Sequence, residues 1–272
     1  MIEIVEPGPS ATVQDLGRIG RAAVGVPRSG GFDRAALRAA NRLVGNPDNA
    51  AVVECTFGGL RLRVERAVTV ALTGAACAGA PDWGRAVTLP AGAEVSLGTP
   101  AVGLRSYLAV RGGLDVDPIL GSRSTDTLSG LGPPALRPGS RLAVGTARGN
   151  PADGTWVAPA GVDAHRVVLG PRADWFTPAA AARLLEARWT VRDRSDRVGV
   201  RLDGPRLERA VDGELPSEPT VPGALQVPPD GRPIVFGPDA PVTGGYPVIA
   251  VLRDLDPIAQ ARPGDTVRFT TR

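Results

Sequence analysis

The sequence contains no lysine, so all 31 of its basic residues are arginine. This absence excludes the lysine of a nucleotide-binding P-loop, a Schiff-base lysine and a covalently attached biotin. Histidine is nearly absent as well, and His165 alone cannot form a histidine-rich metal site or a two-histidine relay. A Ser-His-Asp triad would have to use His165, which opens an expected strand after a Pro/Gly-rich linker. Chemistry on this chain must therefore rest on carboxylates, arginines, carboxamides, hydroxyls and backbone N–H groups.

Cysteine and long apolar runs are also scarce. Cys55 and Cys77 are too few and too far apart for a disulfide framework or a thiol metal site, so we expect two reduced, buried thiols and no metal. No apolar run approaches the length of a membrane span, and residues 1–10 lack the features of a signal peptide. We therefore expect a soluble, cytoplasmic protein that does not contact a membrane. The net charge is only +3 with dispersed arginines, which argues against a nucleic-acid partner.

Glycine and proline, by contrast, are abundant at 35 and 27 residues, which is typical of a β-rich chain with many turns. The sequence predicts a mainly β fold of two small β-barrel halves, residues 1–150 and 151–272, each with one short helix. Weak periodicity over residues 145–164 marks a linker. The helices are expected after Asp33 and after Thr177, where Pro178 follows. Expected strands are 2–5, 52–57, 60–64, 68–72, 87–89, 94–97 and 104–110, then 165–169, 189–202, 224–227, 233–236, 247–252 and 266–270.

The longest irregular stretch covers residues 12–33 and shows neither helical nor strand periodicity. A connection of this length is uncommon in a compact chain unless it is functional or disordered. Apolar residues recur through it, which argues against disorder. We interpret it as an ordered loop that brings polar groups together. Its backbone N–H groups at residues 29–33, before the first helix, are expected to face an anion or a carbonyl oxygen.

Four stretches place charged or amide side chains among glycines, where a backbone can approach a ligand closely: residues 12–18, 121–130, 194–202 and 217–247. Each has a purely structural alternative. The second stretch can be an Asx- or Ser/Thr-turn cluster, the third an Asp–Arg network that orders a loop, and the fourth a set of hairpin turns. The residues that we expect to bind substrate are Gln14, Ser29, Asp33, Ser122, Asp126, Arg197, Ser217, Glu218, Gln226, Thr243, Gly244, Gly245 and Tyr246.

Together these groups predict a site with several arginines, a few carboxylates and two carboxamides. Arginine pairs bidentately with carboxylate or phosphate. A carboxylate can orient or deprotonate an amide N–H, and a carboxamide can bind both the donor and the acceptor of an amide or urea. The pattern therefore favours a small amide-like substrate that meets an anionic group.

Several long motifs occur in collinear order between Ile2 and Phe269. They are TVQDLGR, GVPRSGGFD, AANRLVGN, YLAVRGGLDVDPILGSRSTD, SDRVGVRL, GALQVPPDGRPIVF, VTGGYPVIAVL and DLDPIAQARPGDTVRF. In these motifs the chain resembles allophanate hydrolase subunit 2, the biotin-dependent carboxyltransferase family that includes the 5-oxoprolinase C subunits and the antagonist partner of a sporulation-kinase inhibitor. It departs from the family at Pro219, where glycine is expected, and over residues 237–242.

The resemblance implies two cyclophilin-like β-barrel halves and an obligate partner, the homologue of subunit 1, which 5-oxoprolinases designate B. The expected function is that of the C subunits of bacterial 5-oxoprolinases, hydrolases that open the cyclic amide 5-oxoproline to L-glutamate with ATP hydrolysis. The chain is expected to be active only in a complex with subunits A and B. No adenine- or phosphate-binding motif is visible, so we expect ATP to bind mainly on the partner subunit, and no biotin to be attached to this chain.

Two other functions stay open from the resemblance. One is the carboxyltransferase component of a biotin-dependent urea carboxylase/allophanate hydrolase system, and the other is a non-catalytic partner that regulates a kinase-inhibitor protein. In the oxoprolinase interpretation, Arg18 or Arg123 stabilises a phosphorylated lactam oxygen, and Asp15 or Asp239 orients the substrate N–H. These four are the candidate catalytic residues.

Overall fold

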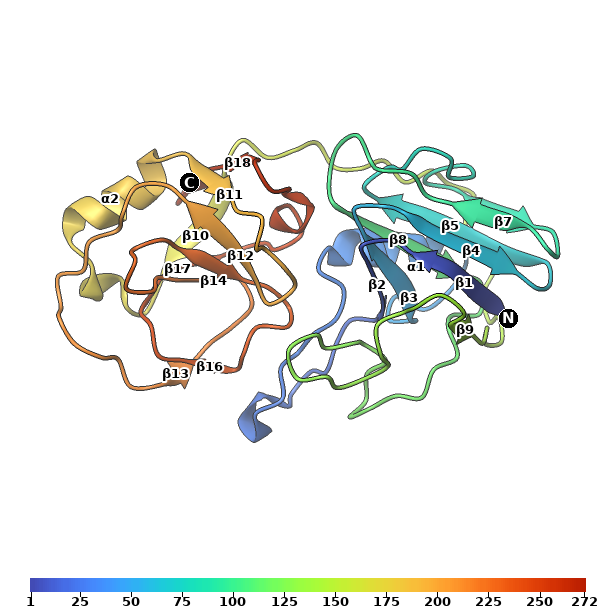
Figure 1. Cartoon of the computed structure of the whole chain (residues 1–272), viewed down its shortest axis with the longest axis horizontal. Coiled ribbons are helices and arrows are strands. Elements are labelled where there is room, and N and C mark those ends of the chain that lie inside the picture. The colour runs from blue at the N-terminus through green and yellow to red at the C-terminus, as the bar shows by residue number, and fades with distance from the viewer. The chain divides into compact units, whose positions relative to one another are not determined.

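The computed structural model describes all 272 residues, and its strands confirm the mainly β fold class (Figure 1). Its contacts divide the chain into two compact units. The first contains Met1–Arg18 and Ser29–Pro159, and the second contains Ile19–Arg28 and Ala160–Arg272. The boundary after Pro159 lies inside the expected linker. The ten-residue segment Ile19–Arg28 groups with the second unit although the first unit's sequence flanks it on both sides.

The first unit is built from two antiparallel sheets. One has the strand order β7-β4-β1-β9 and the other the order β2-β3-β8-β5-β6. The strands of the first sheet are β1 (Ile2–Pro7), β4 (Leu60–Val64), β7 (Glu94–Ser96) and β9 (Arg141–Leu142). Those of the second are β2 (Ser10–Gln14), β3 (Val52–Thr56), β5 (Val68–Gly74), β6 (Ala86–Leu89) and β8 (Arg105–Val110).

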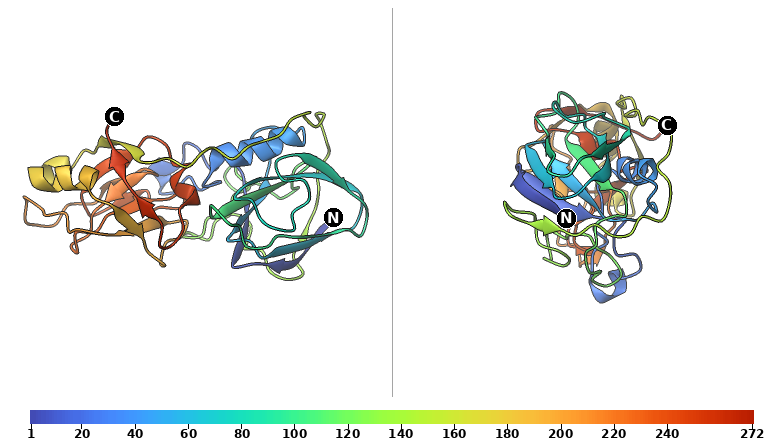
Figure 2. Two further views of the ribbon diagram at one scale, coloured as in Figure 1. Left: turned by 90° about the horizontal axis from the view of Figure 1, so that it is seen from above. Right: turned by 90° about the vertical axis from the view of Figure 1, so that its right-hand side faces the viewer.

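Alternation along the strands makes the core of this unit. In β4, Leu60, Leu62 and Val64 are buried while Arg61 and Arg63 point outward, as expected for a strand with one face on the core. Strand β8 is buried at all six positions because a helix covers its outer face. That helix is α1 (Arg34–Leu43), which packs on β5 and β8 through the stripe that includes Leu37 (Figure 2).

The second unit is organised by an eight-stranded sheet with the order β18-β11-β12-β15-β14-β17-β10-β19. Only Arg268 separates β18 from β19, so the two ends of the sheet are joined through one residue and the sheet curls into a nearly closed barrel (Figure 1). Its strands are β10 (His165–Leu169), β11 (Trp189–Val191), β12 (Gly199–Asp203), β14 (Ala224–Gln226), β15 (Ile234–Phe236), β17 (Val248–Leu252), β18 (Thr266–Val267) and β19 (Phe269–Thr270).

The remaining elements of the second unit are short. A two-stranded ribbon pairs β13 (Glu218–Pro219) with β16 (Thr243–Gly244). Helix α2 (Pro178–Glu186) begins with Pro178 and is capped by the Thr177 hydroxyl, as predicted. Three 3-10 turns complete it: η1 (Ala22–Val24), η2 (Ala173–Trp175) and η3 (Ile258–Gln260). No helix of the chain is long and apolar enough to cross a membrane.

Three sequence predictions about elements were wrong, one of them the single strand expected over residues 266–270, which is divided at Arg268 into β18 and β19. The irregular stretch expected from residue 12 begins three residues later, at residue 15, because Thr12–Gln14 belongs to β2 and pairs with β3. The strand expected over residues 189–202 is two strands, β11 and β12. Asp196 interrupts it, since its Oδ1 accepts hydrogen bonds from the N–H groups of Val198 and Gly199 and so forms a tight turn.

His165 makes the second unit sensitive to acid. Burial lowers the pKa of this imidazole from 6.5 to about 4, against a smaller raising effect of Asp254, and its Nδ1 has no hydrogen-bond partner. The unfolded chain therefore binds the proton first as pH falls, and stability is lost between pH 6.5 and about 4. The loss should reach about 3 kcal/mol. In thermal melts over this range, H165Q should flatten the fall in Tm; equal slopes in both proteins would contradict the prediction.

Candidate functional site

In the first unit, several polar side chains contact the loop of residues 119–132. Asp15 anchors this loop. The Asp15 Oδ1 accepts from the Ser122 Oγ at 2.6 Å, the Ser124 Oγ at 2.5 Å and the Gly17 N–H at 2.8 Å. Its Oδ2 accepts from the Arg123 N–H at 2.6 Å. These contacts occupy the carboxylate, so Asp15 positions the loop, and we do not assign it the orienting of a substrate N–H. Ser122 shares this positioning role.

Arg18 follows Asp15 and is almost fully buried, with 2% of its surface exposed. Its Nε donates to the Ile119 carbonyl at 3.2 Å, and its Nη2 donates to the Ser124 carbonyl at 2.5 Å. Its Nη1 is buried and has no partner. A buried guanidinium N–H without an acceptor is costly, so Arg18 holds one donor that no group of the protein satisfies.

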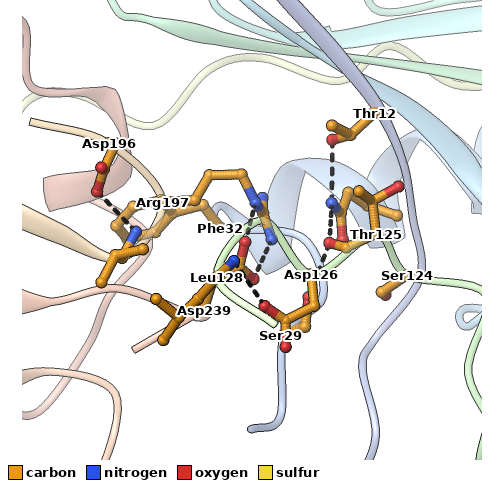
Figure 3. Close-up of polar contacts among 12 residues, drawn as sticks. Thr12, Ser29, Phe32, Ser124, Thr125, Asp126, Leu128, Asp196, Arg197 and Asp239 are labelled. Carbon is orange, nitrogen blue, oxygen red and sulfur yellow. Dashed lines mark hydrogen bonds and ion pairs between the residues drawn. The ribbon is translucent and has the colours of Figure 1, made fainter. Parts of the chain in front are cut away.

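Gln14, at the end of β2, offers the opposite polarity. Its Nε2 donates to the Thr12 Oγ1 at 3.0 Å and to the Thr125 carbonyl at 2.9 Å (Figure 3). These two bonds fix the amide orientation and leave Oε1 buried with no donor. Gln14 is therefore a held carboxamide with one open acceptor.

Asp126 provides a second open acceptor on the same loop. Its Oδ1 accepts from the N–H groups of Leu128 at 2.9 Å and Ser129 at 3.1 Å, which forms an Asx turn. This is the turn cluster that the sequence left as an alternative for residues 121–130. Its Oδ2 is buried without a partner, and the residue is 1% exposed. The turn thus accounts for one carboxylate oxygen and leaves the other without a donor.

Ser29, which lies far from this loop in the sequence, also contacts it. Its Oγ donates to the Thr125 carbonyl at 2.9 Å. Its backbone adopts a left-handed φ of 53°, which residues other than glycine rarely adopt. Next to it, a Cβ at Gly30 would lie 2.9 Å from the Gly17 nitrogen, so only glycine fits. The structure therefore places Gln14, Arg18 and Ser29 against the loop of residues 119–132, which contains Asp126.

The N–H groups before α1 were expected to face an anion or a carbonyl oxygen, and for two of them the protein itself supplies that acceptor, while the third meets a hydroxyl. The Gly31 N–H donates to the Asp15 carbonyl at 2.9 Å, the Phe32 N–H to the Glu54 Oε2 at 2.9 Å, and the Asp33 N–H to the Tyr107 hydroxyl at 2.7 Å. The Asp33 Oδ1 caps α1 by accepting from the Ala36 N–H. The protein itself thus satisfies these donors, and Asp33 has a structural role.

Sequence reasoning missed Glu54 and Tyr107. They are opposite each other in the β3–β8 pairing, and the Tyr107 hydroxyl donates to the Glu54 Oε2 at 2.8 Å. Burial, and then the nearby Glu54 carboxylate, raise the pKa of Tyr107 well above its usual value, so it stays a donor. The Arg105 guanidinium lies 4.2 Å from the centre of the Phe32 ring. A lone carboxylate inside the apolar strand VVECTF was the available signal.

Arg123 is half-buried, and its Nε donates to the Val116 carbonyl at 2.6 Å. This bond holds the side chain against its own loop. Unlike Arg18, Arg123 has no buried guanidinium nitrogen without a hydrogen-bond partner. Of the two candidate arginines, Arg18 is the better fit to a ligand oxygen.

In the second unit, Arg197 and Asp239 form a buried bidentate ion pair. The Arg197 Nε and Nη2 donate to Oδ2 and Oδ1 of Asp239, each at 2.9 Å (Figure 3). The Asp239 N–H also donates to the Arg197 carbonyl at 3.2 Å. This is the loop-ordering Asp–Arg network that the sequence left open, and it argues for a structural role of Asp239.

We predict that D239A destabilises the second unit by about 3–5 kcal/mol, because it leaves Arg197 buried without its carboxylate. Urea denaturation of the full chain measures the change. As a matched control, Asp203 pairs with Arg232 at 2.7 Å in an exposed pair, so D203A should cost less than about 1 kcal/mol. A catalytic role for Asp239 would instead appear as lost turnover at unchanged stability.

A second group in this unit gathers at the β13–β16 ribbon. The Arg172 Nε donates to the Glu218 Oε2 at 2.9 Å, and Glu218 faces Gly244 in the ribbon. The Arg172 hydrogen bond holds the pKa of Glu218 below its usual value. The Gln226 Nε2 donates to the Tyr246 carbonyl at 3.1 Å, and a Cβ at Gly244 would lie 2.4 Å from that nitrogen.

A side chain at position 244 would therefore displace the Gln226 amide from its bond with the Tyr246 carbonyl. Gly245 has its nearest such contact at 3.6 Å, so its lack of a side chain is not forced. Ser217, Thr243, Gly245 and Tyr246 are exposed, and Tyr246 retains 44% of its surface. No group of three or more His, Cys, Asp or Glu side chains in the chain is placed to hold a metal ion.

The comparisons with known proteins fit this architecture. Residues 24–271 match the family model described as "Carboxyltransferase domain, subdomain A and B". The chain belongs to this carboxyltransferase-domain family. Two of its relatives are the 5-oxoprolinase C subunits of Escherichia coli (strain K12) and Haemophilus influenzae. The chain is 39% identical to the E. coli protein over 280 residues, an alignment that covers 99% of this chain and 90% of the relative. It is 33% identical to the H. influenzae protein, with the same coverage.

Other members of the carboxyltransferase-domain family are larger proteins. The urea amidolyase of Lachancea kluyveri is 32% identical over 98% of this chain, which spans 17% of that relative. Among solved structures, TTHA0988 superposes with a TM-score of 0.89 at 36% identity over 99% of this chain, and the K. lactis urea amidolyase with 0.91 at 29% identity over 98%. The chain spans 55% and 18% of those two structures.

Proposed function

We propose that this chain functions as one of the 5-oxoprolinase C subunits, acting with subunits A and B to open 5-oxoproline to L-glutamate with ATP hydrolysis. The observation that carries the proposal is the similarity to two curated 5-oxoprolinase C subunits, which covers 99% of this chain and 90% of each relative. A fused urea amidolyase, by contrast, shares only 17% of its length with this chain.

The open atoms of the first unit support an amide substrate. A lactam presents one N–H donor and one carbonyl acceptor. The Arg18 Nη1 is an open donor for the carbonyl oxygen, and the Gln14 Oε1 and Asp126 Oδ2 are open acceptors for the N–H. Donors fixed in place before the reaction stabilise charge that develops on a carbonyl oxygen. We assign Arg18 to the lactam oxygen and Asp126 to the lactam N–H, with Gln14 as the second acceptor.

ATP is assigned mainly to the partner subunits. This chain has no lysine, so it lacks the P-loop lysine that binds β- and γ-phosphates. The chain should also be cytoplasmic with its partners, since the substrate and ATP are cytoplasmic metabolites in this assignment.

Reconstitution tests the function. The chain is combined with its A and B homologues, ATP and 5-oxoproline, and glutamate and ADP are measured. Stoichiometric glutamate formation that disappears when any one component is left out supports the proposal. A complete complex that forms no glutamate would overturn it.

Carboxyl transfer is the second candidate, favoured by the name of the matching family model and the urea amidolyase relatives. This chain would then receive a carboxyl group from a biotin carried elsewhere, because it has no lysine to biotinylate. Incubation with a biotin carboxylase, a biotinylated carrier, bicarbonate and urea distinguishes the two. Urea-dependent fixation of labelled bicarbonate, without glutamate formation in the first assay, would decide for this candidate.

A further inference from the structure

A shallow pocket of about 310 Å³ opens in the first unit and contains none of the residues discussed above as site residues. Its polar side chains are Arg66, Arg111, Thr69 and Thr88, and one wall is formed by Val144, Gly145 and Ala147. Its volume is at the lower end of the range for small-molecule sites. No carboxylate lines it.

The strand register places three of these side chains in a row. Thr69 of β5 faces Thr88 of β6, and the Arg111 N–H donates to the Thr69 carbonyl at 2.8 Å on the other side of β5. Neighbours directly opposite each other in a sheet share a face. Val68 and Val70 are buried in the core, so the intervening Thr69, with Thr88 and Arg111, faces outward.

This row has unused hydrogen-bond donors. The Arg111 Nη2 donates to the Gly149 carbonyl at 3.0 Å, but its Nε is buried and has no partner. Arg66 makes a single side-chain hydrogen bond, a long one of 3.4 Å to the Val144 carbonyl. The two threonine hydroxyls are 3.0 Å apart and bond to each other, which leaves one O–H free.

The charge of the pocket is positive and uncompensated. Glu65 is next to Arg66 in sequence, but its carboxylate pairs with Arg141 and with the N-terminal amine. Two guanidiniums with open N–H groups and a free hydroxyl match the oxygens of a phosphate, which arginine binds bidentately. A phosphate dianion also balances the two positive charges, whereas a single carboxylate balances one.

We propose that this pocket binds the phosphate group of a small molecule, with Arg66 and Arg111 as charge partners and the one free hydroxyl hydrogen of the Thr69–Thr88 pair as a further donor. This pocket shares no residue with the proposed lactam site, and the proposal does not depend on the proposed reaction.

Isothermal titration calorimetry of the full chain at constant ionic strength tests this site, with inorganic phosphate and glycerol 2-phosphate as probes and acetate as the carboxylate comparison. We expect one phosphate per chain, and at least about a tenfold loss of affinity in R66Q and R111Q. T88V, which keeps both charges, should weaken binding less. R137Q removes an equal charge from an exposed arginine whose guanidinium makes no hydrogen bond, and it should bind like wild type.

Three results would overturn the proposal: no saturable phosphate binding, acetate binding as tight as phosphate, or an equal loss of affinity in R137Q. R66Q guards against misfolding of R111Q, because Arg66 is exposed and its replacement should leave the thermal melt unchanged. Preference for glycerol 2-phosphate over inorganic phosphate would identify an organic phosphate as the ligand.

Discussion

D126N is expected to lower kcat/KM of the reconstituted complex by roughly 100-fold or more, while the chain keeps its fold. The substitution is isosteric. Its remaining oxygen can still accept from the N–H groups of Leu128 and Ser129, so the Asx turn persists. The open Oδ2 becomes an NH₂ group, which presents hydrogens to the lactam N–H instead of an acceptor. The charge that would orient or receive that proton is lost as well.

Steady-state glutamate formation measures the loss of activity in D126N, and a thermal melt of the same preparation shows whether its stability has changed. Asp196 supplies the matched control, because its Oδ1 accepts from the N–H groups of Val198 and Gly199 in the same kind of turn, but the residue is exposed. D196N should leave kcat/KM within about twofold of wild type. A D126N complex with normal kcat/KM would remove Asp126 from the site, and a D126N chain that melts early would assign it to the loop instead.

The sequence predicts local features of this fold well, because they depend on neighbouring residues. Asp33 and Thr177 cap their helices as expected, since a capping side chain binds an N–H three residues away. The alternation in β4 identifies its buried face directly. The break between β11 and β12 was missed because the turn at Asp196 contains no glycine or proline at its centre, and the flanking apolar residues read as one strand.

The candidate site was predicted only as a set of stretches. Residues 12–18 and 121–130 do come together in the first unit, but the division of labour within them depends on contacts more than 100 residues apart. Asp15 and Asp126 are both acids beside small polar residues, and the sequence ranked Asp15 as the reactive one. The structure shows Asp15 with four donors and Asp126 with an open oxygen, a difference that no local pattern encodes.

The same limit applies to the support beneath the loop of residues 29–33. In the sequence, Glu54 and Tyr107 look like ordinary members of core strands. Only the register of β3 against β8 brings them together under the backbone N–H groups that were expected to face an anion or a carbonyl oxygen. An internal carboxylate fills the place of the expected anion. The loop is therefore fixed by the protein core, and the strained Ser29 backbone at its start is held by the hydrogen bond from the Ser29 Oγ to the Thr125 carbonyl.

Replacing Glu54 should test that support with a large loss of stability. E54A removes the acceptor of the Phe32 N–H and the Tyr107 hydroxyl and leaves Arg105, which lies 3.8 Å from the Glu54 Oε1, buried without its carboxylate. We expect the free energy of unfolding to fall by about 3–5 kcal/mol in urea denaturation of the full chain. Y107F, which deletes one hydroxyl of the same network, should cost about 1–3 kcal/mol.

The control and the double variant separate a buried network from a simple charge effect. E94A breaks the exposed pair between Glu94 and Arg63, 2.6 Å apart, and should cost less than about 1 kcal/mol. E54L combined with R105M removes both buried charges, so it should be more stable than E54L alone, as expected when an unpaired charge dominates the cost. If E54A costs no more than E94A, the loop of residues 29–33 does not depend on the Glu54 carboxylate. Its conformation must then come from the glycines and from its other hydrogen bonds, those of Ser29 with Thr125 and of Gly31 with Asp15.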